Sequence, residues 1–282
     1  VLKKGSRRYR SLAELQADPP VCDAYIAGSD QIWNVGSARR IERAFYLDFG
    51  PRSVRRVAYA ASFGQCSIGP ELHSEIASLL DGLDAIGVRE KNGTRFAADL
   101  LQGRKPVQQV VDPTFLLSPV DYAPIVEECR GAKGSLVTYI LAEYHAPQLG
   151  ILGRVRERLG VPLVNLRNPD TCVRFGRDLD RVVDPYHWLG AVSQARFVLC
   201  SSFHGVVFSL LYHRDFLAVS PYPNARVESL LELFGLEGRF MTEFDQGAVD
   251  RAVDSPIDWD RVDAILADRA KESLAFLEKA LG

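Results

Sequence analysis

Residues 197–211 read FVLCSSFHGVVFSLL, a short apolar run, a polar turn and a second apolar run. The first run, residues 197–200, has the length and β-branched or aromatic content of a buried strand. The second run predicts a helix over residues 206–212. A strand that leads through a polar turn into a helix is the repeating unit of a parallel α/β sheet, and ligands of such sheets bind at the turn.

The same alternation extends through the rest of the chain. Strands are predicted at residues 24–27, 56–61, 85–88, 107–111, 135–141, 161–166, 196–200 and 216–219. Helices are predicted at residues 71–83, 92–101, 147–158, 186–194 and 227–234, and from about Trp259 to the end. Asn92 is taken as the N-cap of the second of these helices. This pattern predicts the α/β class, with mainly parallel, doubly wound sheets.

The polar, glycine-containing residues 130–134 interrupt the alternation and are predicted to be a linker. The chain is therefore divided into an N-terminal Rossmann-like domain, residues 1–130, and a C-terminal Rossmann-like domain, residues 131–282. The C-terminal domain carries the turn at 201–205 and closes on an amphipathic helix. Ligands are expected in the cleft between two such domains, outside the carboxyl ends of the strands.

Composition narrows the range of functions. The 282 residues are 47% hydrophobic and 25% charged, with a net charge of -2, so no basic footprint for nucleic acid is present. The basic run at residues 3–10 leaves open a contact with an acidic partner or a peripheral contact with a membrane, beside a solvated terminus. No apolar run approaches the length of a membrane span, and no signal-peptide pattern occurs.

Cysteine usage and motif searches limit the chemistry further. Five cysteines stand at positions 22, 66, 129, 172 and 200, without a CxxC pair. An odd, scattered set argues against a disulfide framework or a thiolate zinc site, so a reducing, cytoplasmic location is expected. Metalloprotease, P-loop and GxSxG motifs are absent from the sequence, so metal binding, P-loop chemistry and serine-hydrolase chemistry have no support in it.

The turn at 201–205 is the strongest candidate site. Ser201 and Ser202 would stand at a helix N-terminus, whose N–H groups and dipole attract anions. Gly205 would permit close approach of backbone or ligand. His204 adds a group that can donate or accept a proton near neutral pH, which suits proton transfer or the departure of phosphate. The alternative is a capped helix whose histidine packs in the core.

Residues 28–34, GSDQIWN, form the second candidate because they follow a predicted strand directly. Asp30 can accept a hydrogen bond from a sugar hydroxyl, with Gln31 beside it, and Trp33 can stack on a sugar ring. The alternative is a capped turn with Trp33 in the core.

Two arginines also follow strands. Arg89 precedes a helix and offers a bidentate fork for phosphate or carboxylate. Arg226 lies before a helix one strand beyond His204, so it can reach the same pocket. For Arg89 the alternative is a surface pair with Glu90, and for Arg226 it is a surface arginine at the start of a helix. Residues 112–114, Asp-Pro-Thr, are assigned a structural role in a turn.

Taken in order, these segments resemble the polysaccharide pyruvyl transferase family. The resemblance is carried by residues 23–34, 58–64, 88–90 and 111–117, by the SSFHG unit and by residues 226–236. It implies two Rossmann-like domains in the arrangement called GT-B. It also implies transfer of pyruvate from phosphoenolpyruvate to a sugar of a cell-surface or exopolysaccharide glycan, as a ketal, with release of phosphate and without a cofactor.

The resemblance also implies residue roles. His204 is the expected general acid. Arg89 and Arg226 would hold phosphate and carboxylate, and Ser201, Ser202, Phe203 and Gly205 would complete the anion pocket. Asp30, Gln31 and Trp33 are assigned to the acceptor, which is a glycan or a lipid-linked sugar.

The chain departs from the family in two places. Some members carry arginine two residues before the histidine, where this chain has Ser202. Members usually begin with a further strand–helix segment rich in glycine and asparagine, so the resemblance predicts a truncated N-terminal domain. Two other functions remain open at this stage. One is a glycosyltransferase that uses a nucleotide sugar, with Asp170, Asp178 or Asp184 binding ribose, and the other is a non-catalytic glycan-binding relative.

Overall fold

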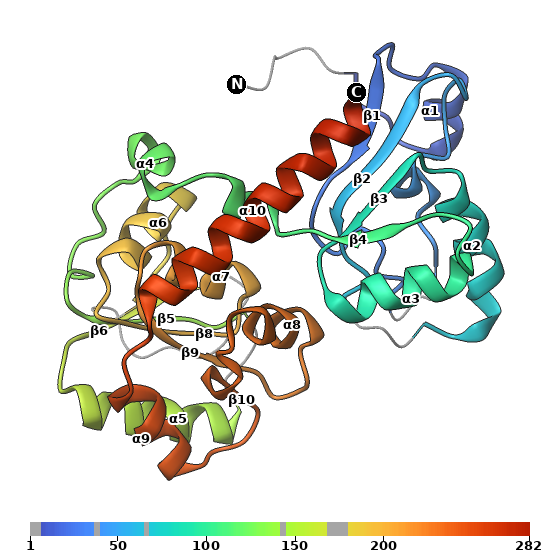
Figure 1. Cartoon of the computed structure of the whole chain (residues 1–282). Coiled ribbons are helices and arrows are strands. Elements are labelled where there is room, and N and C mark those ends of the chain that lie inside the picture. Colours follow the sequence, from blue (N-terminus) through green and yellow to red (C-terminus); the bar gives the residue numbers. More distant parts are fainter. Residues whose placement is uncertain (1–6, 37–39, 65–67, 142–144, 168–179) are drawn as a thin grey trace. The chain divides into compact units, whose positions relative to one another are not determined.

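The computed structural model describes residues 7–36, 40–64, 68–141, 145–167 and 180–282 (Figure 1). The chain divides into two compact units. Unit 1 comprises Val1–Pro113 with Arg269–Gly282, and unit 2 comprises Thr114–Asp268. Each unit is built on one parallel sheet with helices, which confirms the predicted α/β class with two Rossmann-like halves.

The division between the units differs from the predicted linker at residues 130–134. Residues after Pro113 already pack within unit 2, where Phe115 contacts Phe234 and Tyr122 contacts Phe208 edge to face. The C-terminal helix α10 (Trp259–Leu281) begins in unit 2 and ends in unit 1. The division therefore lies earlier in the chain than the glycine-containing stretch, because residues after Pro113 pack within unit 2.

Unit 1 carries four parallel strands in chain order: β1 (Ala24–Ala27), β2 (Arg55–Ala61), β3 (Ala85–Val88) and β4 (Val107–Gln109). Its helices are α1 (Leu12–Ala17), η1 (Arg43–Tyr46), η2 (Pro70–Leu72), α2 (His73–Asp81) and α3 (Lys91–Leu101). Because all four strands are parallel and in sequence order, the loops that follow them meet at one edge of the sheet.

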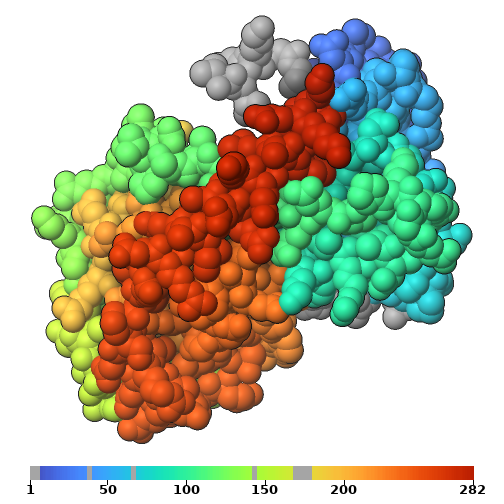
Figure 2. All heavy atoms as spheres, viewed as in Figure 1, coloured from blue at the N-terminus to red at the C-terminus, as the bar shows by residue number. Residues whose placement is uncertain are grey.

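The last turns of α10 close unit 1 through side chains on and beside the sheet. Phe276 lies 6.3 Å from Tyr59, measured between ring centroids, and Ser273 Oγ accepts a hydrogen bond from the backbone N of Val111. A Cβ atom at Gly87 would stand 3.0 Å from Phe276, so this glycine lets the ring lie directly on β3. Outward side chains of α10, such as Leu274, remain on the surface (red in Figure 2).

Arg56 organises the loop between residues 47 and 54. Its guanidinium is buried and donates to five backbone carbonyl groups. The acceptors are Leu47, Phe49, Gly50, Pro51 and Val54, at 2.6 to 3.1 Å. One side chain at the start of β2 therefore satisfies a loop that would otherwise bury unpaired carbonyl groups.

Unit 2 carries six parallel strands in the order β10-β9-β8-β5-β6-β7. Their bounds are β5 (Leu136–Tyr139), β6 (Leu163–Leu166), β7 (Asp180–Arg181), β8 (Phe197–Cys200), β9 (Asp215–Val219) and β10 (Phe240–Met241). From β5 the chain runs outward to β6 and β7, and from β8 it runs outward in the other direction. The neighbours β5 and β8 therefore form a topological switch point, where doubly wound sheets bind ligands.

The helices of unit 2 are η3 (Pro113–Leu116), α4 (Pro119–Tyr122), η4 (Ala123–Ile125), α5 (Ala146–Leu159), α6 (Pro185–Gln194), α7 (Phe203–Leu211), α8 (Ala225–Phe234), η5 (Glu237–Arg239) and α9 (Gln246–Asp254). The core around β5, β8 and β9 includes Phe197, Leu199 and Leu217. No helix in the described parts of the chain is long and apolar enough to cross a membrane.

Several helix starts differ from the sequence-based prediction. Helix α7 begins at Phe203, three residues before the predicted start, so His204 lies in its first turn. Helix α3 begins at Lys91 with Glu90 in the N-cap position, so the assignment of Asn92 as N-cap is wrong. Asn92 instead accepts a hydrogen bond from the N–H of Gly93 within the first turn. The short elements α1, α9, β7 and β10 were not predicted, because they lack a long apolar pattern.

The role of Arg56 is testable by charge-conserving substitution. Arg56→Lys should lower the free energy of unfolding by roughly 2–4 kcal/mol, because an ammonium group cannot reach five carbonyl groups as the planar guanidinium does. Urea unfolding followed by circular dichroism measures this loss. The neighbouring Arg55→Lys is the matched control, since exposed Arg55 donates to one carbonyl, that of Ala280. Equal stability of the two variants would contradict the assignment.

Candidate functional site

A cavity of about 430 Å³ lies in unit 2 where β8, β5, β6 and β7 end. The side chains that define its chemistry are Tyr139, Arg167, Asp184, Trp188, Ser202 and His204. Tyr139 ends β5, Arg167 follows β6, Asp184 and Trp188 come from the start of α6, and Ser202 and His204 come from the start of α7. The cavity therefore lies at the topological switch point of this sheet.

Two serines hold the turn between β8 and α7. Ser201 donates its backbone N–H to the carbonyl of Tyr139 at 3.1 Å, and its Oγ accepts from the backbone N of Leu141 at 2.9 Å. Ser202 is the N-cap of α7, and its Oγ accepts from the N–H of Gly205 at 3.3 Å. Ser201 thus joins the loops of the two central strands, whereas Ser202 lines the cavity beside the positive end of the helix dipole.

Gly205 and Phe203 pack against neighbouring residues of the protein. The sequence predicted that Gly205 permits close approach of backbone or ligand. A Cβ atom at Gly205 would stand 2.8 Å from Cys200 Sγ, so the glycine lets α7 pack against its own strand. Burial raises the pKa of the Cys200 thiol to about 12. Phe203 is 4% exposed and packs edge to face on His204 at 5.3 Å. Phe203 therefore holds the imidazole ring and is not among the residues that line the cavity.

Half-buried His204 faces the cavity, so the alternative of a fully buried core histidine does not describe it. Arg226 was expected in the same pocket, but it lies in the first turn of α8 and is not among the lining residues. The reason is strand order: α8 follows β9, on the far side of β8 from β5. The arginine that lines the cavity is Arg167. It directly follows the strand predicted at residues 161–166, and the sequence analysis did not consider the residue after that strand.

Asp184 begins helix α6 as its N-cap. Its Oδ1 accepts from the backbone N and from Nδ1 of His187, both at 3.0 Å. These hydrogen bonds lower the pKa of Asp184, and the carboxylate in turn raises the pKa of His187. The other side of His187 faces Glu127, with 3.4 Å between Nε2 and Oε2. Asp184 is thus a fixed, ionised carboxylate at the wall of the cavity.

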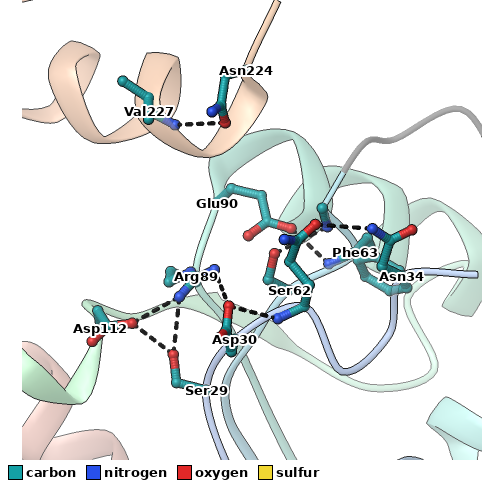
Figure 3. A network of polar contacts seen from close by, with 12 residues as sticks. Ser29, Asp30, Asn34, Ser62, Phe63, Arg89, Glu90, Asp112, Asn224 and Val227 are labelled. Carbon is teal, nitrogen blue, oxygen red and sulfur yellow. Dashed lines mark hydrogen bonds and ion pairs between the residues drawn. The ribbon is translucent and has the colours of Figure 1, made fainter. Parts of the chain in front are cut away.

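The polar residues of unit 1 gather at the carboxyl ends of β1, β3 and β4 (Figure 3). Arg89 Nη1 donates to Asp112 Oδ2 at 2.8 Å and to Ser29 Oγ at 3.2 Å, and Ser29 Oγ donates to the same carboxylate oxygen at 2.7 Å. The side chains of Arg89 and Asp112 are 3% and 1% exposed. Arg89 is therefore a buried partner of Asp112, and the structural role assigned to residues 112–114 includes this ion pair.

Asp30 is the exposed member of this cluster. Its side chain is 63% exposed, and its Oδ1 lies 3.5 Å from Arg89 Nη2. Its backbone has φ of 79°, in the left-handed region that non-glycine residues rarely adopt. Gln31 bonds through Oε1 to Asn34 Nδ2 at 2.9 Å. A Cβ atom at Gly64, whose φ is 73°, would collide with both of these side chains, so a glycine is required there.

Trp33 does not face a ligand. It is 1% exposed, stacks on Tyr46 with ring centroids 5.0 Å apart, and donates from Nε1 to the carbonyl of Phe45 at 3.1 Å. The expectation that its ring stacks on a sugar is therefore wrong. The apolar interior of unit 1 takes the indole because its one polar atom has a backbone partner there.

Glu90, which the sequence suggested only as a surface partner of Arg89, is a buried carboxyl group. It is 1% exposed, and its Oε1 accepts from the backbone N of Phe63 at 2.8 Å. Burial raises its pKa, against the opposing effects of Ser62, Arg89 and the Phe63 N–H.

Some candidates lie outside the described residues: Asp170, Asp178 and residues 3–6 of the basic run at 3–10. Among the residues that are described, no group of three or more His, Cys, Asp and Glu side chains is arranged to hold a metal ion.

Comparisons with known proteins point to one family. A family model described as "Polysaccharide pyruvyl transferase" matches residues 2–221. No curated protein matches the chain. Two solved structures are similar at low identity. The glycotransferase of kitacinnamycin is 13% identical, with 85% of this chain and 78% of that chain covered and a TM-score of 0.47. UDP-N-acetylglucosamine 2-epimerase from Rickettsia bellii is 10% identical, with 95% and 76% covered and a TM-score of 0.49.

The buried pair in unit 1 gives a prediction about stability. Asp112→Asn should lower the free energy of unfolding by about 3–5 kcal/mol, because it leaves the buried Arg89 charge uncompensated. The double variant Arg89→Met, Asp112→Leu removes both charges and should lose less than Asp112→Asn alone. Chemical denaturation of the three proteins measures both values. An additive double variant would show that the two side chains do not depend on each other.

Glu90 gives a prediction about pH. Its pKa is higher in the folded than in the unfolded chain, so the folded state binds this proton more tightly. Stability should therefore be greatest below the ordinary carboxyl pKa and should fall as pH rises through the folded pKa. Glu90→Gln keeps an acceptor for Phe63 N–H and should be more stable than wild type at neutral pH, with the difference vanishing in acid. Denaturation across pH tests this, and a difference that grows in acid would contradict it.

Proposed function

The chain belongs to the polysaccharide pyruvyl transferase family, and from this premise we propose that it transfers pyruvate from phosphoenolpyruvate to two hydroxyl groups of one sugar. The product is a pyruvate ketal on a cell-surface or secreted polysaccharide, and phosphate is released. The acceptor is a glycan or a lipid-linked sugar, and the proposed location is the cytoplasm.

One observation supports this proposal above the others: His204 and Arg167 line the same cavity at the N-terminus of α7. Phosphoenolpyruvate carries a phosphate and a carboxylate, so it needs a cation and a helix N-terminus. Its enol carbon needs a proton donor within the same space. Some family members have arginine at the position of Ser202, and in this chain Arg167 would supply the cation instead.

The chemistry assigns one proton transfer to His204. The imidazolium donates a proton to the methylene carbon of phosphoenolpyruvate, which becomes a methyl group and leaves an oxocarbenium-like carbon beside the phosphate ester. A sugar hydroxyl oxygen bonds to that carbon and loses its proton, which restores the charge of His204. The second hydroxyl oxygen then bonds to the same carbon, the carbon–oxygen bond to phosphate breaks, and phosphate leaves with the second hydroxyl proton.

The remaining residues have supporting roles in this proposal. Ser202 caps α7 and so aims the helix dipole at the anion. Ser201 and Gly205 position the turn, and Phe203 holds the ring of His204. Arg89 positions Ser29 and Asp30 from its buried place beside Asp112. Exposed Asp30 and half-buried Gln31 and Arg226 remain predicted contacts to substrate.

A second candidate function is transfer of a sugar from a nucleotide sugar. Asp184 favours it, because an ionised carboxylate at the cavity wall suits the hydroxyl groups of a ribose. The cation and the histidine beside it favour the smaller anionic donor. The two candidates differ in which donor binds, so direct titration separates them.

Calorimetric titration of the chain with phosphoenolpyruvate, and separately with UDP-glucose, tests the proposal. Phosphoenolpyruvate should bind and UDP-glucose should not. Arg167→Met should weaken binding of phosphoenolpyruvate roughly 10- to 100-fold, because it removes charge-assisted hydrogen bonds. Exposed Arg156 on α5 provides the control Arg156→Met, which changes the same net charge away from the cavity. Binding of UDP-glucose alone would favour the second function.

The role of His204 is tested by turnover, measured as phosphate release in the presence of a glycan acceptor. His204→Ala should lower kcat by roughly 100- to 10,000-fold, the usual size of a general acid–base contribution. The affinity for phosphoenolpyruvate should change far less than kcat. A variant with unchanged kcat would remove His204 from the chemistry.

A further inference from the structure

The cavity in unit 2 has a second wall that the anionic donor does not use. We infer that this wall holds the ring of the accepting sugar, with Asp184 bonded to its hydroxyl groups and Trp188 and Tyr139 packed on its carbon atoms. The inference rests on the proposed function and adds where the acceptor binds. It moves the acceptor ring to unit 2, whereas the sequence suggested residues 30–33 of unit 1.

The size of the cavity is the first argument. Its volume is about 430 Å³, within the range of roughly 300–1,000 Å³ typical of sites for drug-sized ligands. A three-carbon phosphate ester is much smaller than such ligands. The space beside Arg167, Ser202 and His204 therefore leaves room for one further small ring in the same cavity.

The charges of the lining residues are the second argument. Arg167 and the N-terminus of α7 favour an anion, whereas the Asp184 carboxylate repels one. A multiply charged donor is therefore directed toward Arg167 and away from Asp184. The ligand that suits the Asp184 wall is neutral and rich in hydroxyl donors, which is the chemistry of a sugar ring.

The third argument is that the side chain of Asp184 is already held in place by hydrogen bonds. Its Oδ1 accepts from the backbone N and from Nδ1 of His187. The side chain is 51% exposed, so the carboxylate can also accept from a ligand. A carboxylate that is already held by its own helix loses little freedom when it accepts from a ligand, so its hydrogen bonds contribute more to affinity.

The aromatic residues complete the wall. Trp188 lines the cavity and packs edge to face on Tyr139 at 5.4 Å and on Phe208 at 5.6 Å, measured between ring centroids. These contacts fix the orientation of the indole before a ligand arrives. A rigid aromatic surface next to an ionised carboxylate offers apolar contact to the C–H groups of a sugar and an acceptor to its O–H groups.

The test uses a substitution that removes only the charge. Asp184→Asn keeps an N-cap of equal quality for α6, so the helix should remain as stable as in wild type. Asp245→Asn is the matched control, because Asp245 is the N-cap of α9, accepts from the N–H of Ala248 at 2.8 Å and does not line the cavity. The full chain is used for all three proteins.

The probes are methyl β-galactoside, methyl β-glucoside and methyl N-acetyl-β-mannosaminide, each titrated with phosphoenolpyruvate present and followed by saturation-transfer NMR. At least one glycoside should bind wild type and the Asp245→Asn control equally. Asp184→Asn should weaken its binding about tenfold, the difference between a charge-assisted and a neutral hydrogen bond. The affinity for phosphoenolpyruvate should stay the same or rise, because a repelling charge is gone.

The outcomes separate the two claims. If phosphoenolpyruvate binds as proposed but glycosides bind Asp184→Asn as tightly as wild type, the acceptor wall is wrong and the donor site stands. If no glycoside shows saturation transfer with wild type, the inference that this wall binds the acceptor sugar is also wrong. If phosphoenolpyruvate fails to bind wild type in calorimetry, the proposed function itself is wrong, whatever the glycosides do.

Discussion

The parallel pairing of β5 with β8 is the constraint on which the candidate site depends. Their register sets Tyr139 opposite Cys200, so the two strands end at the same level. The residues that follow are then joined by the bonds of Ser201 to Tyr139 and Leu141. Because the chain leaves these strands in opposite directions, a gap opens between the outgoing loops, and His204 and Arg167 reach it from either side.

The helix that carries His204 is held in place by contacts of small residues. Gly205 lets α7 lie against Cys200, and Ser202 caps the helix from the cavity side. A larger residue at 205 would push the helix from its strand and move the imidazole with it. Most residues of the SSFHG sequence therefore fix the position of the histidine. The serines and the glycine hold the turn, the phenylalanine packs on the histidine, and the histidine faces the cavity.

In unit 1, the charged residues near the strand ends are held by a buried ion pair. Arg89 and Asp112 follow the neighbouring strands β3 and β4 and neutralise each other below the surface, with Ser29 bonded to both. Such a pair contributes little net stability, yet each member requires the other. Exposed Asp30, in a left-handed backbone conformation beside this pair, is the part of the cluster that faces outward. Backbone strain of this kind is retained where the surroundings over-determine it, which is common at functional sites.

The sequence by itself determined the α/β class, nearly every long strand and helix, and the strand–turn–helix unit that carries His204. Each of these depends on local periodicity and on the residue types next to a strand end. It could not tell Trp33 in the core from Trp33 on a ligand, since both uses place an aromatic residue after a strand. Strand order was the larger unknown. Only tertiary structure decided that β5 and β8 are neighbours, that Arg167, Asp184 and Trp188 join His204, and that Arg226 does not line that cavity. The physical reason is that these residues are brought together by sheet pairing between segments distant in the chain, and no local pattern encodes that pairing.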